Sequence, residues 1–158
     1  FPIISLFTVF MLQGAIMMVV SLPVQIALSD ADASLSVVSY IGIVLFAIGI
    51  FFEAVGDWQL AQFKRNPNSS GQVMQTGLWK YTRHPNYFGD TCVWWGIGVV
   101  ALGSSFGWVG LFGSLLMNFF LVRVSGVPML ERSMSKRRPG YDEYKRRTSS
   151  FVPRPPKK

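Results

Sequence analysis

The sequence has few of the residues that metal sites and disulfides require. Among its 158 residues there is one cysteine, Cys92, and one histidine, His84. A single cysteine excludes an intramolecular disulfide, and one cysteine with one histidine is too few for a zinc site of the usual ligand count. We therefore expect no bound metal, and we expect Cys92, which lies in an apolar segment, to fill the core.

The loops that bind nucleotides in common soluble folds are also missing. The chain has no G-x-G-x-x-G after a strand and no G-x-x-x-x-G-K-[ST], which argues against a Rossmann fold and a P-loop. A Ser-His-Asp triad is not indicated, because the single histidine is followed directly by Pro85. Charge is scarce as well, since 15% of the residues are charged against roughly 25% in soluble domains.

Long apolar stretches take the place of the missing charge. The hydrophobic share is 50% and the mean hydropathy is +0.34. Stretches of roughly 20 apolar residues can cross a bilayer as helices. Candidates are residues 1–28, which Pro23 would kink or end, 37–58, the somewhat short 87–102, and 106–124. The sequence thus predicts an all-α fold, a polytopic membrane helix bundle with about four transmembrane helices.

The connectors between these stretches predict the orientation in the membrane. Residues 29–34 contain two acids and no base, and residues 103–105 are neutral. Every lysine and arginine lies in the 64–83 loop, at the end of the last apolar stretch, or in the tail formed by residues 125–158. The positive-inside rule then places the loop and the C-terminus of this multi-pass protein in the cytoplasm.

A single membrane domain is expected to include residues 1–158. The chain begins at Phe1 within an apolar stretch, so we expect it to be the C-terminal part of a longer protein. The basic tail is expected to meet anionic membrane lipids, at about 1 kcal/mol per basic residue. Nucleic acid is not an expected partner, because no recognition module is visible. The sequence does not indicate an oligomeric state.

Polar residues at the cytoplasmic ends of the apolar stretches form the next pattern. Glu53 and Asp57 are four residues apart, as are Asn86 and Asp90, so each pair shares one face of a helix. Ionisable groups in a membrane cost about 2.5–3.5 kcal/mol at mid-depth and usually face a cavity or a partner. We expect a cytoplasm-facing cavity whose polar groups suit a ribose or amide and whose cations suit phosphate. The alternative is structural pairing with nearby cations, namely Lys64, Arg83 or Arg123.

The longest polar motif spans residues 77–90, with the sequence GLWKYTRHPNYFGD. Together with residues 139–144 and 151–153, it resembles the C-terminal domain of the steroid 5-alpha-reductase family, most of all its uncharacterised bacterial and plant branch. The same superfamily includes sterol delta-14-reductases and isoprenylcysteine carboxyl methyltransferases. The resemblance extends over nearly the whole chain, and it implies a cofactor bound in a cytoplasm-facing pocket of the helix bundle.

This resemblance implies roles for individual residues. Asp57 would hold the cofactor, Lys64 would contact phosphate where the family has Arg, and Asn86 would fix a nicotinamide. The substrate-polarising Glu and Tyr of the reductases lie in N-terminal helices outside this sequence, so no catalytic residue is assigned. The implied cofactor-binding set is Asp57, Lys64, Arg83, His84, Asn86, Asp90, Arg123, Tyr141 and Tyr144.

The expected function is therefore that of an NADPH-dependent reductase. It would reduce a double bond in a lipid-soluble substrate, which could be steroid-like, isoprenoid or acyl, and which would enter from the bilayer. One alternative is a lipid or isoprenoid methyltransferase that uses S-adenosylmethionine, because the superfamily contains both kinds of enzyme. A second alternative is a membrane scaffold without catalytic activity, whose charges serve topology alone.

Overall fold

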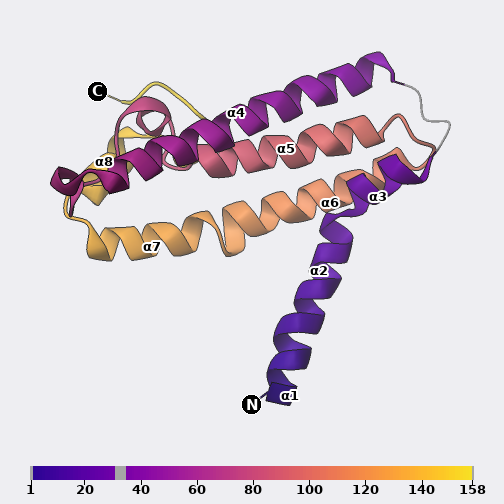
Figure 1. Ribbon diagram of the computed structural model, residues 1–158, viewed down its shortest axis with the longest axis horizontal. Helices are drawn as coiled ribbons and strands as arrows, with labels where there is room; N and C mark the ends of the chain where they lie inside the picture. The colour runs from indigo at the N-terminus through magenta and orange to yellow at the C-terminus, as the bar shows by residue number, and fades with distance from the viewer. Residues whose placement is uncertain (1, 31–34, 158) are drawn as a thin grey trace. The chain divides into compact units, whose positions relative to one another are not determined.

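The computed structural model describes residues 2–30 and 35–157, and its regular elements are helices joined by turns and loops (Figure 1). No strand occurs within those two ranges, so the all-α prediction is confirmed. The elements are α1 Pro2–Ser5, the π-helix η1 Leu6–Met11, α2 Leu12–Val20, α3 Leu22–Ser29, α4 Val37–Arg65, the 3₁₀ turns η2 Pro67–Ser69 and η3 Gly77–Lys80, α5 Pro85–Ala101, α6 Gly107–Phe119, the π-helix η4 Phe120–Val124, α7 Val127–Arg137 and α8 Tyr141–Arg147.

Within residues 2–30 and 35–157, two helical stretches are long and apolar enough to cross a membrane. They are Val37–Arg65, of 29 residues, and Gly107–Arg137, of 31 residues. The bent pair Phe7–Val20 and Leu22–Ser29 would add a third if it forms one span. Helix α5 has 17 residues, which is at the short end of the roughly 17–25 that spanning helices use. A polytopic helix bundle is therefore plausible, and a crossing by α5 stays a prediction.

The break in the N-terminal helices follows from Pro23, as the sequence predicted. The chain bends by 49° between Val20 and Leu22. Proline lacks an N–H and is tolerated in the first turn of a helix, and Pro23 lies in the first turn of α3. Gln25 donates from Nε2 to the Met18 carbonyl at 3.1 Å and thereby satisfies an acceptor near the break.

The chain divides into two compact units. Unit 1 comprises residues 1–46 and 94–117, and unit 2 comprises residues 47–93 and 118–158. In unit 1, Asp30 accepts the Ser105 N–H at 3.0 Å and so joins two connectors. Residues 31–34 of the predicted acidic connector lie outside the described residues. All predicted cofactor-binding residues belong to unit 2.

Glycine brings the helices of unit 2 close together. A Cβ on Gly89 of α5 would lie 2.5 Å from the Glu53 N atom and 2.6 Å from the Gly49 O atom of α4. Only a residue without a side chain allows this approach of two backbones. Cys92 follows on α5 and is buried, as expected of a core residue. The N-terminal end of α5, which carries much of the 77–90 motif, is thereby fixed against α4.

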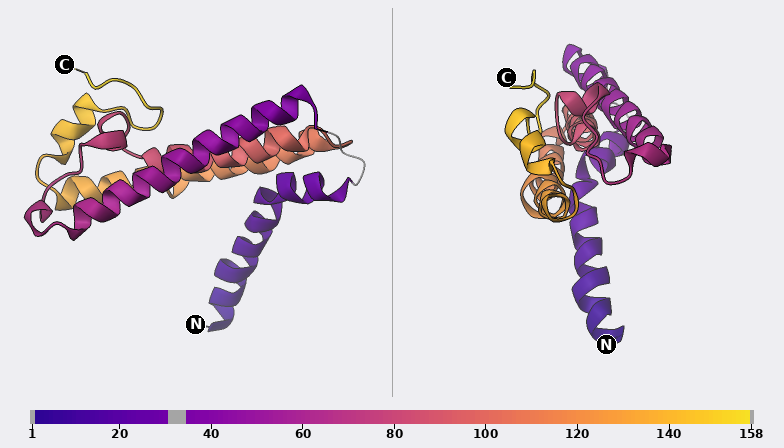
Figure 2. Two further views of the ribbon diagram at one scale, coloured as in Figure 1. Left: turned by 45° about the horizontal axis from the view of Figure 1, so that its top comes forward. Right: turned by 90° about the vertical axis from the view of Figure 1, so that its left-hand side faces the viewer.

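The segment before α5 and the C-terminal segment complete unit 2. Trp79 donates from Nε1 to the Gly56 carbonyl at 3.0 Å, and Gln59 accepts the Leu78 N–H at 2.9 Å, so η3 is tied to α4. Helix α8 lies beside α7, where Ser135 donates to Asp142 at 2.9 Å (Figure 2). After α8 the backbone pairs with the motif, because Arg83 N–H donates to the Ser149 carbonyl at 2.9 Å.

Candidate functional site

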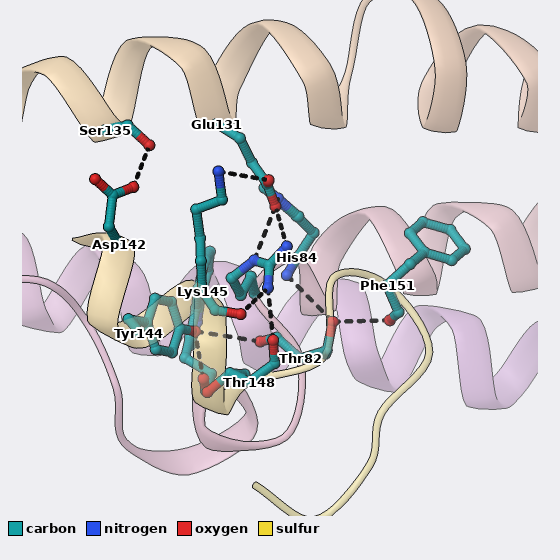
Figure 3. A network of polar contacts seen from close by, with 11 residues as sticks. Thr82, His84, Glu131, Ser135, Asp142, Tyr144, Lys145, Thr148 and Phe151 are labelled. Carbon is teal, nitrogen blue, oxygen red and sulfur yellow. Dashed lines mark hydrogen bonds and ion pairs between the residues drawn. The ribbon is translucent and has the colours of Figure 1, made fainter. Parts of the chain in front are cut away.

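A buried cluster of charged side chains lies where the 77–90 motif meets α7 (Figure 3). Glu131 of α7 accepts from Arg83 Nε at 2.8 Å and from Arg83 Nη2 at 2.7 Å, both at its Oε1 atom. The same oxygen lies 3.1 Å from His84 Nε2. Arg83 is 8% exposed and Glu131 14% exposed, so the pair is largely withdrawn from water and each charge requires the other.

The remaining donors of Arg83 bind the main chain. Its Nη1 atom donates to the Lys145 carbonyl at 2.9 Å and to the Thr148 carbonyl at 2.6 Å. Both carbonyls lie at the C-terminal end of α8. The last carbonyls of a helix lack donors within the helix and can accept hydrogen bonds from a basic side chain. Arg83 therefore joins the segment before α5 to α7 and to the end of α8, and these contacts use four of its five N–H donors.

His84 has one nitrogen paired and one without a partner. Glu131 is an acceptor when ionised, so the Nε2 atom of His84 is the donor in their contact. The Nδ1 atom is buried and has no hydrogen-bond partner within the described part of the chain. Tyr87 stacks on the imidazole with ring centroids 5.4 Å apart, and the ring itself is 1% exposed. A buried polar atom of this kind requires an explanation, such as a ligand.

Two tyrosines of α8 form another buried part of the site. The Tyr144 hydroxyl donates to the Trp79 carbonyl, and the Thr82 carbonyl lies 3.5 Å away. Burial, and to a smaller extent the charge of Glu131, raises the pKa of Tyr141 to about 12. Burial likewise raises the pKa of Tyr144. Both hydroxyls are therefore neutral at physiological pH.

A cavity of about 170 Å³ adjoins these residues. Its walls come from α4, the segment from Gln72 to His84, α7 and α8. Apolar side chains form most of the wall, among them Leu60, Phe63, Leu130 and Met134. Aromatic rings and cations complete it: Trp79, Tyr141 and Tyr144, with Lys64, Arg83 and Arg138. None of the described lining residues is acidic.

The structure brings part of the predicted cofactor set to this cavity. Lys64, Arg83, His84, Tyr141 and Tyr144 line it. The other predicted residues lie elsewhere in unit 2 and are not among its lining residues: Asp57, Asn86, Asp90 and Arg123.

The residues outside the cavity have contacts of their own. Asn86 donates from Nδ2 to Asp57 Oδ1 at 3.0 Å, so these two form a pair across α4 and α5. Arg123 is exposed at the end of η4. Arg83 lines the cavity and donates to Glu131 and to two main-chain carbonyls, and its contact with a cofactor stays a prediction.

Sequence reasoning missed Glu131, which organises the cluster. It is the single acid between Asp90 and Asp142, within a strongly basic stretch, and this isolation was the available signal. Its partners are 47 and 48 residues earlier in the chain, so the pairing follows only from the packing of α7 against the motif. Trp79 and Arg138 were missed for the same reason.

Comparisons with known proteins agree with the resemblance at a coarse level. The family described as "Protein of unknown function (DUF1295)" matches residues 2–148. This family is part of the steroid 5-alpha-reductase-like superfamily, and the branch within it stays a prediction.

A curated relative carries a more specific name. The chain is 31% identical over 98 residues to "Probable O-methyltransferase ustE" of Ustilaginoidea virens. The similar region covers 61% of this chain and 32% of the relative, so the chain matches about a third of that protein's length. No solved structure matches the chain.

Proposed function

The chain belongs to the DUF1295 family, and we propose that within it this protein is a membrane-embedded methyltransferase. It would use S-adenosylmethionine and act on a lipid-soluble substrate. This was the alternative in the sequence analysis, and two features now favour it over the reductase. One is the arrangement of Arg83 at the cavity, and the other is the similarity to a protein named as a probable O-methyltransferase.

The observation that carries the proposal is that Arg83 already donates to Glu131 and to two main-chain carbonyls. NADPH has a pyrophosphate and a 2′-phosphate, and arginine forks are the preferred partners of such groups. With Arg83 bound to Glu131 and two carbonyls, Lys64 and Arg138 are the remaining cations of the cavity wall. Two cations are few for three phosphates, whereas S-adenosylmethionine has a single carboxylate.

The rest of the wall also fits the smaller cofactor. The sulfonium of S-adenosylmethionine is a cation, and aromatic faces attract cations by about 0.5–2 kcal/mol. Trp79, Tyr141 and Tyr144 supply such rings at the cavity. A volume of about 170 Å³ is below the roughly 300–1,000 Å³ of pockets for drug-sized ligands, so either cofactor requires the cavity to widen, and the larger NADPH requires more widening.

Each group of wall residues would then have one task. Bound S-adenosylmethionine supplies an electrophilic methyl group. Lys64 and Arg138 would hold its carboxylate, and the aromatic rings would orient the sulfonium. The apolar residues Leu60, Phe63 and Leu130 would exclude water and accept the chain of a lipid substrate.

NADPH-dependent reduction is the second candidate. It is supported by the superfamily, which includes reductases, and by the cavity wall, where three cations and no described acid would suit an anionic ligand. The Asp57–Asn86 pair at 3.0 Å would hold an amide group in this case.

Calorimetric titration of the purified protein in detergent distinguishes the candidates. We expect heat of binding with S-adenosylmethionine and with S-adenosylhomocysteine, and none with NADPH. At one hundred times its dissociation constant, the bound cofactor should stabilise the fold by about 2.7 kcal/mol. Binding of NADPH alone would overturn the proposal in favour of the reductase. Binding of neither ligand is the result that a scaffold predicts.

Neighbouring arginines offer a matched pair of variants. Arg138 lines the cavity, whereas Arg137 is exposed and is not among the lining residues. We expect Arg138→Ala to weaken S-adenosylhomocysteine binding about tenfold or more, the loss of one charge-assisted contact of roughly 1.5–3 kcal/mol. Arg137→Ala should leave the affinity unchanged. Equal effects of both changes would indicate a general electrostatic influence and no contact.

A further inference from the structure

The unpaired Nδ1 atom of His84 is the feature of the site that cofactor binding leaves unexplained. The side chain is 1% exposed and lines the cavity, and Nδ1 has no hydrogen-bond partner within residues 2–30 and 35–157. Leaving a buried polar atom unsatisfied costs about 1–3 kcal/mol. Such an atom is retained at a functional site when a ligand completes it.

The contacts around the ring fix which nitrogen bears the hydrogen. Glu131 accepts at 3.1 Å from Nε2, so Nε2 is protonated. A proton on Nδ1 as well would place a second donor in a buried position without an acceptor. The neutral imidazole with hydrogen on Nε2 therefore satisfies the ring best, and Nδ1 carries a lone pair.

The ring is also held in position on three sides. Glu131 binds one edge and Tyr87 stacks on a face, with an angle of 10° between the rings. The backbone N–H of His84 donates to Thr82 Oγ1 at 3.2 Å. Glu131 in turn accepts from the Nε and Nη2 atoms of Arg83. A base oriented by a carboxylate, which is in turn fixed, is the arrangement of general-base sites.

We infer that His84 Nδ1 is the general base of the proposed methyl transfer, and that the acceptor is an acidic hydroxyl such as a phenol or enol. The inference rests on the proposed function. Nδ1 is closed to water in this structure, so the inference requires the acceptor to reach it from the cavity that His84 lines.

The step balances without any further reactant. The substrate O–H proton passes to Nδ1 while an oxygen lone pair forms the new bond to the methyl carbon. The methyl–sulfur bond breaks, and its electron pair stays on sulfur, which becomes a neutral thioether. His84 becomes an imidazolium, and the Glu131 carboxylate at 3.1 Å stabilises the new charge.

The acidity of the acceptor decides whether a base is needed. Carboxylic acids have pKa values of about 4 and are already ionised at neutral pH, so their methylation requires no base. A phenol, with a pKa of about 10 as in tyrosine, keeps its proton and requires one. A buried, oriented base therefore indicates a hydroxyl acceptor and disfavours a carboxylate.

Nuclear magnetic resonance tests the inference without relying on turnover. Because His84 is the single histidine, [¹⁵N]histidine labelling gives signals from one imidazole. We expect one protonated and one unprotonated nitrogen. With S-adenosylhomocysteine present, addition of 4-nonylphenol should shift the unprotonated nitrogen, whereas 4-nonylbenzoate should not. A protonated Nδ1 in the free protein, or an Nδ1 signal that 4-nonylphenol leaves unchanged, overturns the inference.

Methyl transfer from radiolabelled S-adenosylmethionine supplies the second measurement. Asparagine at position 84 is smaller than histidine and places an amide near the Nδ1 position, but it cannot accept a proton at neutral pH. We expect His84→Asn to lower transfer to 4-nonylphenol about 100-fold or more, the usual contribution of a general base. Its affinity for S-adenosylhomocysteine should stay within threefold of the wild type, roughly 0.7 kcal/mol or less.

The two proposals fail in different ways. If S-adenosylhomocysteine binds but the unprotonated nitrogen does not respond to 4-nonylphenol, the methyltransferase proposal stands and the role of His84 is wrong. If S-adenosylhomocysteine does not bind at all, the proposed function is wrong, and the role inferred for His84 is wrong with it. Should His84→Asn not fold, the measurements on the wild-type imidazole still decide the question.

Discussion

Arg83 donates to one carboxylate, which belongs to α7, and to two main-chain carbonyls, which lie at the end of α8. Lysine keeps the charge but cannot reproduce the planar fork. We expect Arg83→Lys to lower the free energy of unfolding by about 1–3 kcal/mol, because buried acceptors lose their donors. Thermal unfolding in detergent, followed by circular dichroism, measures the change.

Arg146 is the control for this substitution. It pairs with Glu143 at 2.6 Å, but its side chain is 71% exposed. Exposed pairs of this kind contribute about 0–1 kcal/mol, so Arg146→Lys should be nearly neutral. Equal losses from the two variants would show that the buried fork of Arg83 has no special role.

The two buried tyrosines predict a loss of stability in alkali. The pKa of Tyr141 is raised by burial to about 12, and that of Tyr144 is raised as well, both from an ordinary value of about 10. A raised folded-state pKa means that the neutral form is preferred in the fold. The contribution of these neutral tyrosines to the free energy of unfolding is complete below pH ~10 and is lost as the pH rises through ~12.

Chemical denaturation between pH ~9 and ~12 tests this prediction. The double variant Tyr141→Phe Tyr144→Phe cannot ionise at these positions. It should therefore lose less stability over this interval than the wild type does, although it starts lower because the hydrogen bond to Trp79 is missing. Parallel losses in both proteins would assign the alkaline effect to other groups.

At the scale of single elements, the close contact of α4 and α5 depends on glycine. In Gly89→Ala the new Cβ would lie 2.5 Å from the Glu53 N atom and 2.6 Å from the Gly49 O atom. Both are backbone atoms and cannot rotate away as a side chain could. We expect a loss of about 1–3 kcal/mol, as for other overpacked positions. The melting temperature of the purified protein measures the effect.

Gly14 of α2 is the matched control, because a Cβ there meets nothing within 4 Å. Alanine is a better helix former than glycine by about 0.5–1 kcal/mol, so Gly14→Ala should be neutral or stabilising. A destabilising Gly14→Ala together with a neutral Gly89→Ala would contradict the close packing of α5 against α4 at Gly89.

The helices could be predicted from the sequence more easily than their ends. Residues 37–58 were expected to form a helix, and α4 continues to Arg65. The added residues are good helix formers, and Pro67 is the first strong breaker. Residues 125–158 were expected only as a cytoplasmic tail, and they contain α7 and α8, with Pro128 in the first turn of α7, where proline is favoured.

The candidate site could be predicted only in part, for a physical reason. Arg83, His84 and Tyr144 were recognisable because they cluster in short motifs. Their buried partners could not be identified, because Glu131 and the Thr148 carbonyl are distant in sequence. Several acids in the sequence could accept from Arg83, and only the packing of the helices decides which one does. The sequence alone does not give that packing.

At the scale of the whole molecule, the distribution of charge predicts which connectors share a side of the membrane. All lysines and arginines lie in the 64–83 loop or beyond residue 122, whereas residues 103–105 are neutral. For this pattern to follow the positive-inside rule, α5 must cross the bilayer with only 17 residues. Because that length is marginal, the crossing of α5 is the part of the topology that most requires a test.

Cysteine labelling in intact cells provides this test. In a Cys92→Ala background, single cysteines replace three exposed residues, Ser70, Gly103 and Ser150. We expect a membrane-impermeant maleimide added outside the cells to label Gly103→Cys and to spare Ser70→Cys and Ser150→Cys until the membrane is opened. If Gly103→Cys is protected together with Ser70→Cys, α5 does not cross. Helix Gly107–Arg137 would then carry the basic tail to the opposite side, against the positive-inside rule, and the tail's cations would have to be explained by ligand binding alone.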